Sequence, residues 1–208
     1  MAYNLNNKLV IAISSRALFD LEEENQIFEK DGLDAYYKYQ LENEDKSLKK
    51  GTGYRLVENI LKINSFFSSD ERQVEVIILS KNNAATSLRI TNAINDLKLD
   101  IIRSAWTSGT NISNYLKAFK VDLFLSADDN DVLNAIENGV AAAKILHSNE
   151  NIHNISNEQV RIAFDGDAVL FSEESELVYK NHGLEAFIEH EKENRNNPLE
   201  MGPFAKLL

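Results

Sequence analysis

Short apolar runs alternate along this chain with stretches in which apolar residues recur at helical spacing. Five runs rich in β-branched residues predict buried strands: Leu9–Ile13, Val74–Leu79, Leu99–Ile102, Val121–Leu125 and Val160–Phe164. Helical periodicity predicts four helices between them: Tyr54–Ile63, Thr86–Leu97, Asn114–Phe119 and Asp129–Leu146. This alternation favours an α/β fold with a mostly parallel, Rossmann-like sheet covered by helices. Such sheets bind ligands at the carboxyl ends of their strands.

The pattern also contains an internal repeat. Residues 9–57 aligned with residues 160–208 at a constant offset of 151 give 13 identities in 49 ungapped positions. Ordinary composition would give about 3. The identities include Gly32 with Gly183 and Gly51 with Gly202. We therefore interpret the chain as a first α/β repeat over residues 1–150, followed by the start of a second copy of the same repeat over residues 158–208.

The second copy is about one third as long as the first. A strand and its following helices without the rest of a sheet leave apolar faces and strand edges without partners, which is unfavourable. We therefore expect an incomplete second repeat. Either the chain is shortened, or this segment packs on the first repeat or on another subunit.

Composition and charge limit the classes of partner. The 208 residues carry a formal net charge of −11, with 33 acidic and 22 basic residues. Nucleic-acid binding usually needs a basic face, so we expect no nucleic-acid partner. No run reaches the ~18 apolar residues of a membrane-spanning helix, so we expect no membrane partner and a cytoplasmic location. A small phosphate ester stays compatible with this charge, because backbone N–H groups, a Lys and a divalent cation can bind it locally.

The two copies differ where their first strands end. The second has Asp165-Gly166-Asp167-Ala168-Val169, whereas the first has Ser14-Ser15-Arg16-Ala17-Leu18. Two carboxylates two residues apart, on a turn after a strand, can share one Mg²⁺ and so neutralise phosphate charge. A plain surface turn is the alternative, since Asp and Gly are common turn residues. The apolar runs on both sides of the segment favour the functional interpretation.

This D-x-D-x-[TV] segment resembles the phosphotransferase signature of the haloacid dehalogenase superfamily. Within that superfamily, the stretch Arg161–Ser172 resembles the first motif of type I cytosolic 5′-nucleotidases. The resemblance to these enzymes covers nearly all of the chain. Other blocks that carry it are Ile11–Phe19, Thr91–Asn95, Tyr115–Phe119, Leu123–Asp128 and Gly183–Leu199. The resemblance implies a haloacid dehalogenase-like fold and Mg²⁺-dependent hydrolysis of nucleoside 5′-monophosphates such as AMP or IMP. It also implies Asp165 as nucleophile, Asp167 as general acid/base, and both as metal ligands.

Members of that family continue well beyond the Pro198-Leu199 region, and the rest of their catalytic set lies there: a Ser/Thr, a Lys and an acidic pair. The first repeat holds analogues in the same order, Ser80, Lys117 and Asp128. Together with Arg16, which could hold phosphate bidentately, these are our candidate phosphate-binding residues. The first repeat thus has analogues of the Ser/Thr, the Lys and the acid but lacks the nucleophile, whereas the second copy has the nucleophile but lacks the rest of the set. We therefore expect the chain alone to be inactive or only very weakly active.

Two alternatives stay open. The Asp165 segment could complete its site by docking beside Ser80, Lys117 and Asp128 of the same or a neighbouring chain, which would make a homo-oligomer. Alternatively, the protein is a non-catalytic nucleotide-binding or regulatory module derived from the nucleotidase family. Phosphate release from AMP and IMP separates an enzyme from such a module.

Overall fold

The computed structural model describes residues 4–147 and 161–205, and the chain divides into two compact units, Met1–Val160 and Arg161–Leu208. Within the described ranges, no helix combines the length and the apolar character needed to cross a membrane. The two units are taken separately below, first the larger one.

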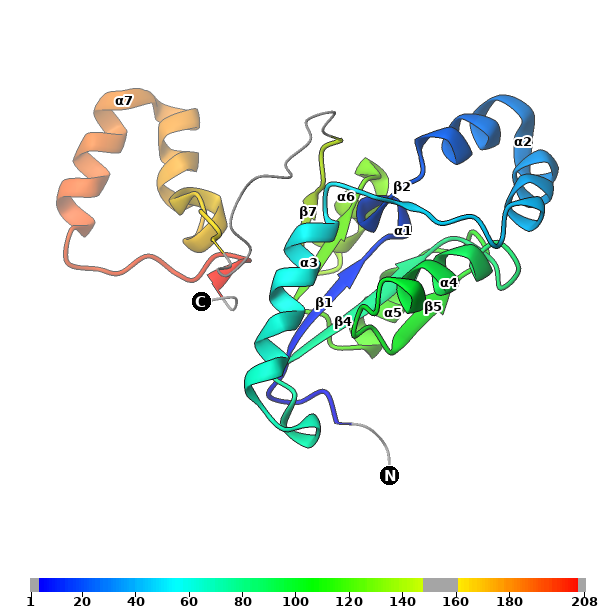
Figure 1. The fold of residues 1–208 in the computed structure, drawn as a ribbon. Helices are drawn as coiled ribbons and strands as arrows, with labels where there is room; N and C mark the ends of the chain where they lie inside the picture. Colours follow the sequence, from blue (N-terminus) through cyan, green and yellow to red (C-terminus); the bar gives the residue numbers. More distant parts are fainter. Residues whose placement is uncertain (1–3, 148–160, 206–208) are drawn as a thin grey trace. The chain divides into compact units, whose positions relative to one another are not determined.

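A parallel sheet of five strands forms the centre of the first unit (Figure 1). Its spatial order is β5-β4-β1-β6-β7, and every neighbouring pair is parallel. The strands are β1 (Leu9–Ile13), β4 (Val74–Ser80), β5 (Arg103–Trp106), β6 (Leu123–Ser126) and β7 (Ala141–Lys144). After β1 the chain adds β4 and β5 on one side of that strand, and then β6 and β7 on its other side. This switch opens a crevice at the carboxyl ends of β1, β4 and β6, where open α/β sheets bind ligands.

Helices and short segments connect the strands. They are α1 (Ser15–Leu18), α2 (Glu22–Glu42), α3 (Tyr54–Leu61), α4 (Leu88–Asp96), α5 (Ser113–Ala118) and α6 (Asp129–Glu137). Two 3₁₀ turns, Lys62–Phe66 and Ser69–Glu71, lead into β4, and a small antiparallel pair joins β2 (Phe19–Asp20) to β3 (Lys49–Lys50). The predicted mostly parallel sheet with covering helices is thus confirmed.

The core lies along the central strands. All seven residues of β4 are buried, and Phe124 of β6 is fully buried against residues such as Ile77 and Leu116. Burial of each large apolar side chain contributes about 1.5–3 kcal/mol, so the sheet and its covering helices stabilise one another. This rigid centre fixes the positions of the strand ends.

In the first unit two predicted elements are wrong, and both errors fall where a helix ends. The strand predicted at Leu99–Ile102 instead runs from Arg103 to Trp106. Leu99 N–H donates to the Ile94 carbonyl at 3.0 Å and so closes the end of α4. An amide that closes a helix in this way is not free to pair in a sheet.

The helix predicted over Asp129–Leu146 ends at Glu137, and Ala141–Lys144 forms β7. Gly139 has a φ of +76°, and Val140 N–H donates to the Ala135 carbonyl at 3.0 Å. This left-handed cap stops the helix. The three alanines, good helix formers in isolation, pair with β6 because tertiary context overrides propensity.

The second unit contains a one-turn segment, Gly166–Leu170, and the helix α7 (Glu174–Asn194). The predicted strand Val160–Phe164 is not found: residues 161–164 form no helix or strand, and Val160 lies outside the described residues. A strand needs a neighbour for its backbone groups, and the described part of this unit pairs only Phe171 with Met201 in an isolated bridge.

The local structure of this unit resembles that of residues 15–54. Both α2 and α7 span 21 residues, and each bends at a glycine of nearly identical conformation. Gly32 has φ 84° and ψ −176°, and Gly183 has φ 83° and ψ −177°. Edge-to-face aromatic pairs bridge both bends, Phe28 with Tyr36 and Tyr179 with Phe187. The offset of 151 between these pairs is the offset of the sequence repeat.

Candidate functional site

A cavity of about 670 Å³ lies at the carboxyl end of the sheet in the first unit. Its walls come from the segments that follow β1, β4 and β6, from the loop after β5, and from α2. The residues that matter most below are Ser14, Ser15, Arg16, Glu24, Phe28, Leu33, Tyr36, Ser80, Lys81, Asn82, Ser126, Asp128 and Asp131. The position is the one expected for a ligand site in an open α/β sheet.

Four buried serines lie where the three central strands end. Ser14 and Ser15 follow β1, Ser80 ends β4, and Ser126 ends β6; none is more than 8% exposed. Ser15 Oγ and Ser80 Oγ are 3.0 Å apart and share a hydrogen bond. Ser14 Oγ accepts from Ala17 N–H at 3.3 Å and thereby caps the short helix α1. Hydroxyl groups, which donate and accept, therefore form the end of the cavity nearest the sheet.

Charged side chains of both signs lie around these hydroxyls. Lys81 Nζ is 2.6 Å from Asp131 Oδ1, and Asp128 Oδ1 accepts from Asp131 N–H at 3.0 Å to cap α6. Arg16 Nη2 is 3.1 Å from Glu22 Oε1. The two acids at the start of α6 thus have partners, Lys81 for Asp131 and a backbone amide for Asp128.

The α2 wall of the cavity is fixed by buried polar contacts. Arg89 of α4 and Glu24 of α2 form an ion pair at 2.5 Å, with side chains only 8% and 6% exposed. Further along, Gln40 Nε2 donates to Tyr36 Oη at 3.0 Å, and Tyr36 Oη donates to Asn82 Oδ1 at 3.1 Å. Burial raises the pKa of Tyr36, so its hydroxyl stays protonated and keeps donating.

Two buried donors of the cavity residues have no partner. Among the residues that the structure describes, Arg16 Nε and Asn82 Nδ2 are both buried without a hydrogen bond. An unpaired buried donor costs about 1–3 kcal/mol, so such atoms are usually paired with protein, water or a ligand. A ligand that carries acceptor oxygens would supply partners for both.

Most of the predicted phosphate-binding residues gather here. Arg16, Ser80 and Asp128 all line the cavity. Lys117 lies elsewhere: it belongs to α5, and its Nζ donates to Asn138 Oδ1 at 3.2 Å. The lysine of the cavity is Lys81, which sequence reasoning missed although it directly follows Ser80 at the end of β4.

The carboxylates Asp165 and Asp167 belong to the second unit. Both are exposed, and Asp165 Oδ1 accepts from Gly166 N–H at 2.7 Å at the start of the turn. Ala168 is held at a φ of +57° two residues before Leu170. Two exposed carboxylates on one tight turn fit as two of the six oxygen ligands of Mg²⁺, with water and phosphate oxygens as the others. In the described ranges, this turn included, no three His, Asp or Glu side chains group as a metal site.

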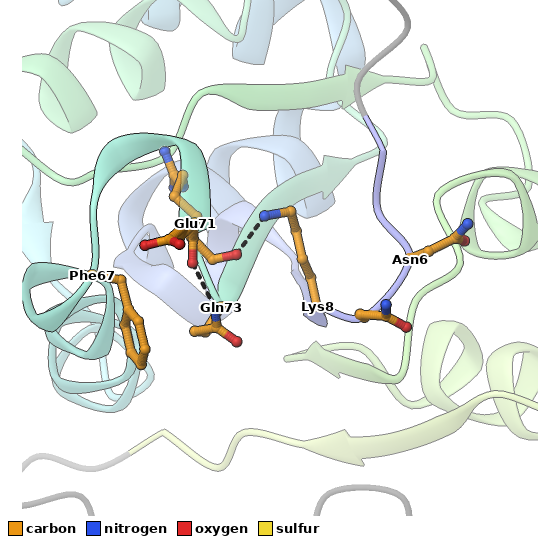
Figure 2. A pocket seen from close by; sticks show the side chains of 7 residues that line it. Asn6, Lys8, Phe67, Glu71 and Gln73 are labelled. Atoms are coloured by element: carbon orange, nitrogen blue, oxygen red, sulfur yellow. Dashed lines mark hydrogen bonds between the residues drawn. The ribbon is translucent and has the colours of Figure 1, made fainter.

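A second cavity, of about 500 Å³, lies at the opposite edge of the sheet, beside the amino ends of β1 and β4 (Figure 2). Its polar groups bind one another: Lys8 Nζ donates to the Arg72 carbonyl, and Gln73 Nε2 donates to the Glu71 carbonyl at 2.6 Å. Ligands of open α/β sheets bind at the other edge. We therefore place the candidate site at the carboxyl end.

Comparisons with known proteins agree with the family resemblance of the sequence and with the α/β fold. The model of the 5′-nucleotidase family matches residues 1–208. The chain is 34% identical over 206 residues to human cytosolic 5′-nucleotidase 1B, an alignment that covers 97% of the chain. The chain spans 34%, or about a third, of the length of that relative. On this evidence the chain belongs to the 5′-nucleotidase family.

Proposed function

We propose that this chain takes part in the hydrolysis of nucleoside 5′-monophosphates, of the AMP or IMP kind, to nucleoside and phosphate. The observation that supports this most is the pair Asp165 and Asp167, which stand two residues apart on an exposed turn in a chain of the 5′-nucleotidase family. Mg²⁺ is the proposed cofactor, and when bound it would neutralise phosphate charge. The name of the cytosolic relative also supports a cytoplasmic location.

The proposed reaction has two displacements at phosphorus. Asp165 attacks the phosphorus, the bond from phosphorus to the 5′ oxygen breaks, and Asp167 donates a proton to that oxygen. The product is a nucleoside and a phosphorylated Asp165. Asp167, now a carboxylate, takes a proton from water as the water attacks phosphorus. Phosphate leaves and Asp165 is free again, so every proton and bond is accounted for.

Exposure of the two carboxylates argues for slow turnover by the 208-residue chain. Charge stabilisation in a transition state is strongest when the donors and cations are fixed in a site that excludes water, and the loss of such groups costs several kcal/mol. Asp165 and Asp167 are both exposed to solvent. We therefore propose that any activity is weak and depends entirely on Asp165.

The experiment is phosphate release from AMP and IMP by the 208-residue chain, with Mg²⁺ and with EDTA. The test variant is Asp165→Asn, which keeps the shape of the side chain and removes its charge. The matched control is Glu185→Gln, an exposed acid on α7 outside the turn. We expect release only with Mg²⁺, lost in Asp165→Asn and kept in Glu185→Gln. Release that survives Asp165→Asn would refute the nucleophile.

The second candidate is a non-catalytic nucleotide-binding module, and one observation favours it. The cavity of about 670 Å³ is lined by residues of the first unit, and at the end of β1 Ser14 and Arg16 stand where the second unit has Asp165 and Asp167. No release by the wild-type chain under any condition, together with nucleotide binding, would favour the module over the enzyme.

A further inference from the structure

We propose that the cavity of the first unit is a binding site for a nucleoside 5′-monophosphate that holds the nucleotide without Mg²⁺ and does not hydrolyse it. Three features support this site: the charge at the end of β1, the unpaired donors and the α2 wall. The choice of a nucleoside monophosphate, rather than another phosphate ester, rests on the function proposed above. All the residues that line the site belong to the first unit.

The first step concerns charge. At the offset of 151, Ser14 corresponds to Asp165 and Arg16 to Asp167. Two carboxylates are thus replaced by a neutral hydroxyl and a guanidinium, a change of three charges in the positive direction. A pair of carboxylates repels phosphate unless a cation lies between them. A serine and an arginine attract phosphate directly, so this position needs no metal.

The second step concerns the acids of the cavity, which could otherwise repel an anion. Glu24 is neutralised by buried Arg89, and Asp131 by Lys81. Asp128 accepts a backbone amide at the start of α6. Arg16 binds Glu22 through Nη2, and its buried Nε has no partner among the residues that the structure describes. A cation with an unpaired buried N–H therefore lies at the end of β1.

The third step concerns the second unpaired donor. Tyr36 donates to Asn82 Oδ1, which orients the amide so that its Nδ2 is the free end. Nδ2 is buried and has no partner among the described residues. Arg16 Nε and Asn82 Nδ2, with the hydroxyls of Ser15 and Ser80, are the donors expected around the oxygens of a phosphate.

The fourth step concerns the rest of the ligand. The α2 wall adds apolar surface to this polar cavity through Phe28, Leu33 and Tyr36. Phe28 and Leu33 are 47% and 60% exposed, and Phe28 packs edge-to-face on Tyr36 at 5.9 Å. Aromatic faces beside a polar end suit a base attached to a phosphate, since bases stack on aromatic rings.

Hydrolysis is not expected at this site. Covalent catalysis by a serine needs a general base that takes its proton. Ser14 Oγ accepts from Ala17 N–H, and the partner of Ser15 Oγ is another hydroxyl, that of Ser80. Within residues 4–147 and 161–205, the hydrogen bonds of these two hydroxyls therefore include no base, and a bound nucleotide would stay intact.

The experiment is calorimetric titration of AMP into the 208-residue chain that carries Asp165→Asn and Asp167→Asn, in EDTA. This background removes the proposed chemistry, so the result is independent of whether the chain is a phosphatase. We expect saturable binding. Arg16→Met should weaken it about 10- to 100-fold, the value of a hydrogen-bonded charge. Lys38→Met, a cation on the exposed side of α2, should leave it unchanged.

Two further probes separate the phosphate from the base. Phe28→Ala should weaken the binding of AMP at least about fivefold and leave the binding of inorganic phosphate unchanged. Adenosine should bind more weakly than AMP, and Arg16→Met should not change its affinity. The proposal is overturned by any of three results: no AMP binding at millimolar concentration, binding that requires Mg²⁺, or binding that Arg16→Met leaves intact in a variant whose thermal unfolding shows it to be folded. Equal affinity for phosphate and AMP would overturn the nucleotide part.

Discussion

The buried pair Glu24–Arg89 offers the sharpest test of how α2 is held over the cavity. Replacement Glu24→Gln keeps the size of the side chain and removes its charge. Arg89 would remain 7% exposed, with its Nε bound to the Lys46 carbonyl at 3.0 Å and its Nη1 without a carboxylate. Breaking a buried pair in this way costs about 3–5 kcal/mol, because one charge stays buried and uncompensated.

The matched control is Glu42→Gln on the same helix. Glu42 lies 3.8 Å from Lys38, and both side chains are more than half exposed, at 63% and 76%. Such an i,i+4 pair is worth about 0.3–0.5 kcal/mol. The two substitutions are chemically identical, so we expect their effects on the free energy of unfolding to differ roughly tenfold because of burial alone.

The assay is urea unfolding followed by tryptophan fluorescence. The single tryptophan, Trp106, lies in β5 and therefore reports on the first unit. For a unit of this size, about 3–5 kcal/mol also corresponds to a fall in melting temperature of roughly 6–20 °C. Equal losses in Glu24→Gln and Glu42→Gln would refute the reasoning. The double variant Glu24→Leu with Arg89→Met should recover much of the loss, since it leaves no buried charge unpaired.

Three other predictions use the same measurement. Lys98 closes α4 at a φ of +52°. The substitution Lys98→Gly should raise the free energy of unfolding by about 0.5–1 kcal/mol, because glycine adopts this conformation without strain. A fall in the free energy of unfolding would contradict this. Gly51→Ala should cost about 1–3 kcal/mol, because its Cβ would lie 2.7 Å from the Phe19 backbone carbon; a neutral result would show that the backbone yields. Burial, and then Glu58, raises the pKa of Tyr54 to about 12. An unfolded tyrosine ionises near pH 10. The contribution of Tyr54 to the free energy of unfolding is therefore complete below about pH 10 and is lost as the pH rises to about 12. Tyr54→Phe should lose less stability over that range than the wild type.

The parts of the fold that could be predicted are those where local pattern and tertiary context agree. Leu9–Ile13 is an unbroken apolar run that lies in the middle of the sheet, and its predicted bounds match the structure. Ala141–Lys144 could not be assigned correctly, because alanine favours helices and only pairing with β6 makes it a strand. The helix α2 is not among the four helices predicted from periodicity, because it has a weak apolar stripe and an internal glycine that bends it.

The candidate site shows the same division. Ser80 and Asp128 could be predicted because the carboxyl ends of parallel strands meet at one edge of a sheet. The lysine could not be chosen in this way: Lys117 matches the order of the family motif, yet Lys81 lies in the cavity. The contacts among Tyr36, Gln40 and Asn82 join residues up to 46 positions apart, and no local signal in the sequence indicates them.

The central claim is that Asp165 carries the chemistry, and a direct test is to trap the phosphorylated residue. The 208-residue chain is mixed with AMP labelled at phosphorus and with Mg²⁺, quenched in acid and digested at acid pH, which preserves an acyl phosphate, and the labelled peptide is identified by mass spectrometry. We predict label on the peptide that contains Asp165 and none on Asp165→Asn, with Asp167→Asn slowing its release. No label on the wild-type chain, or label that persists in Asp165→Asn, would contradict the account.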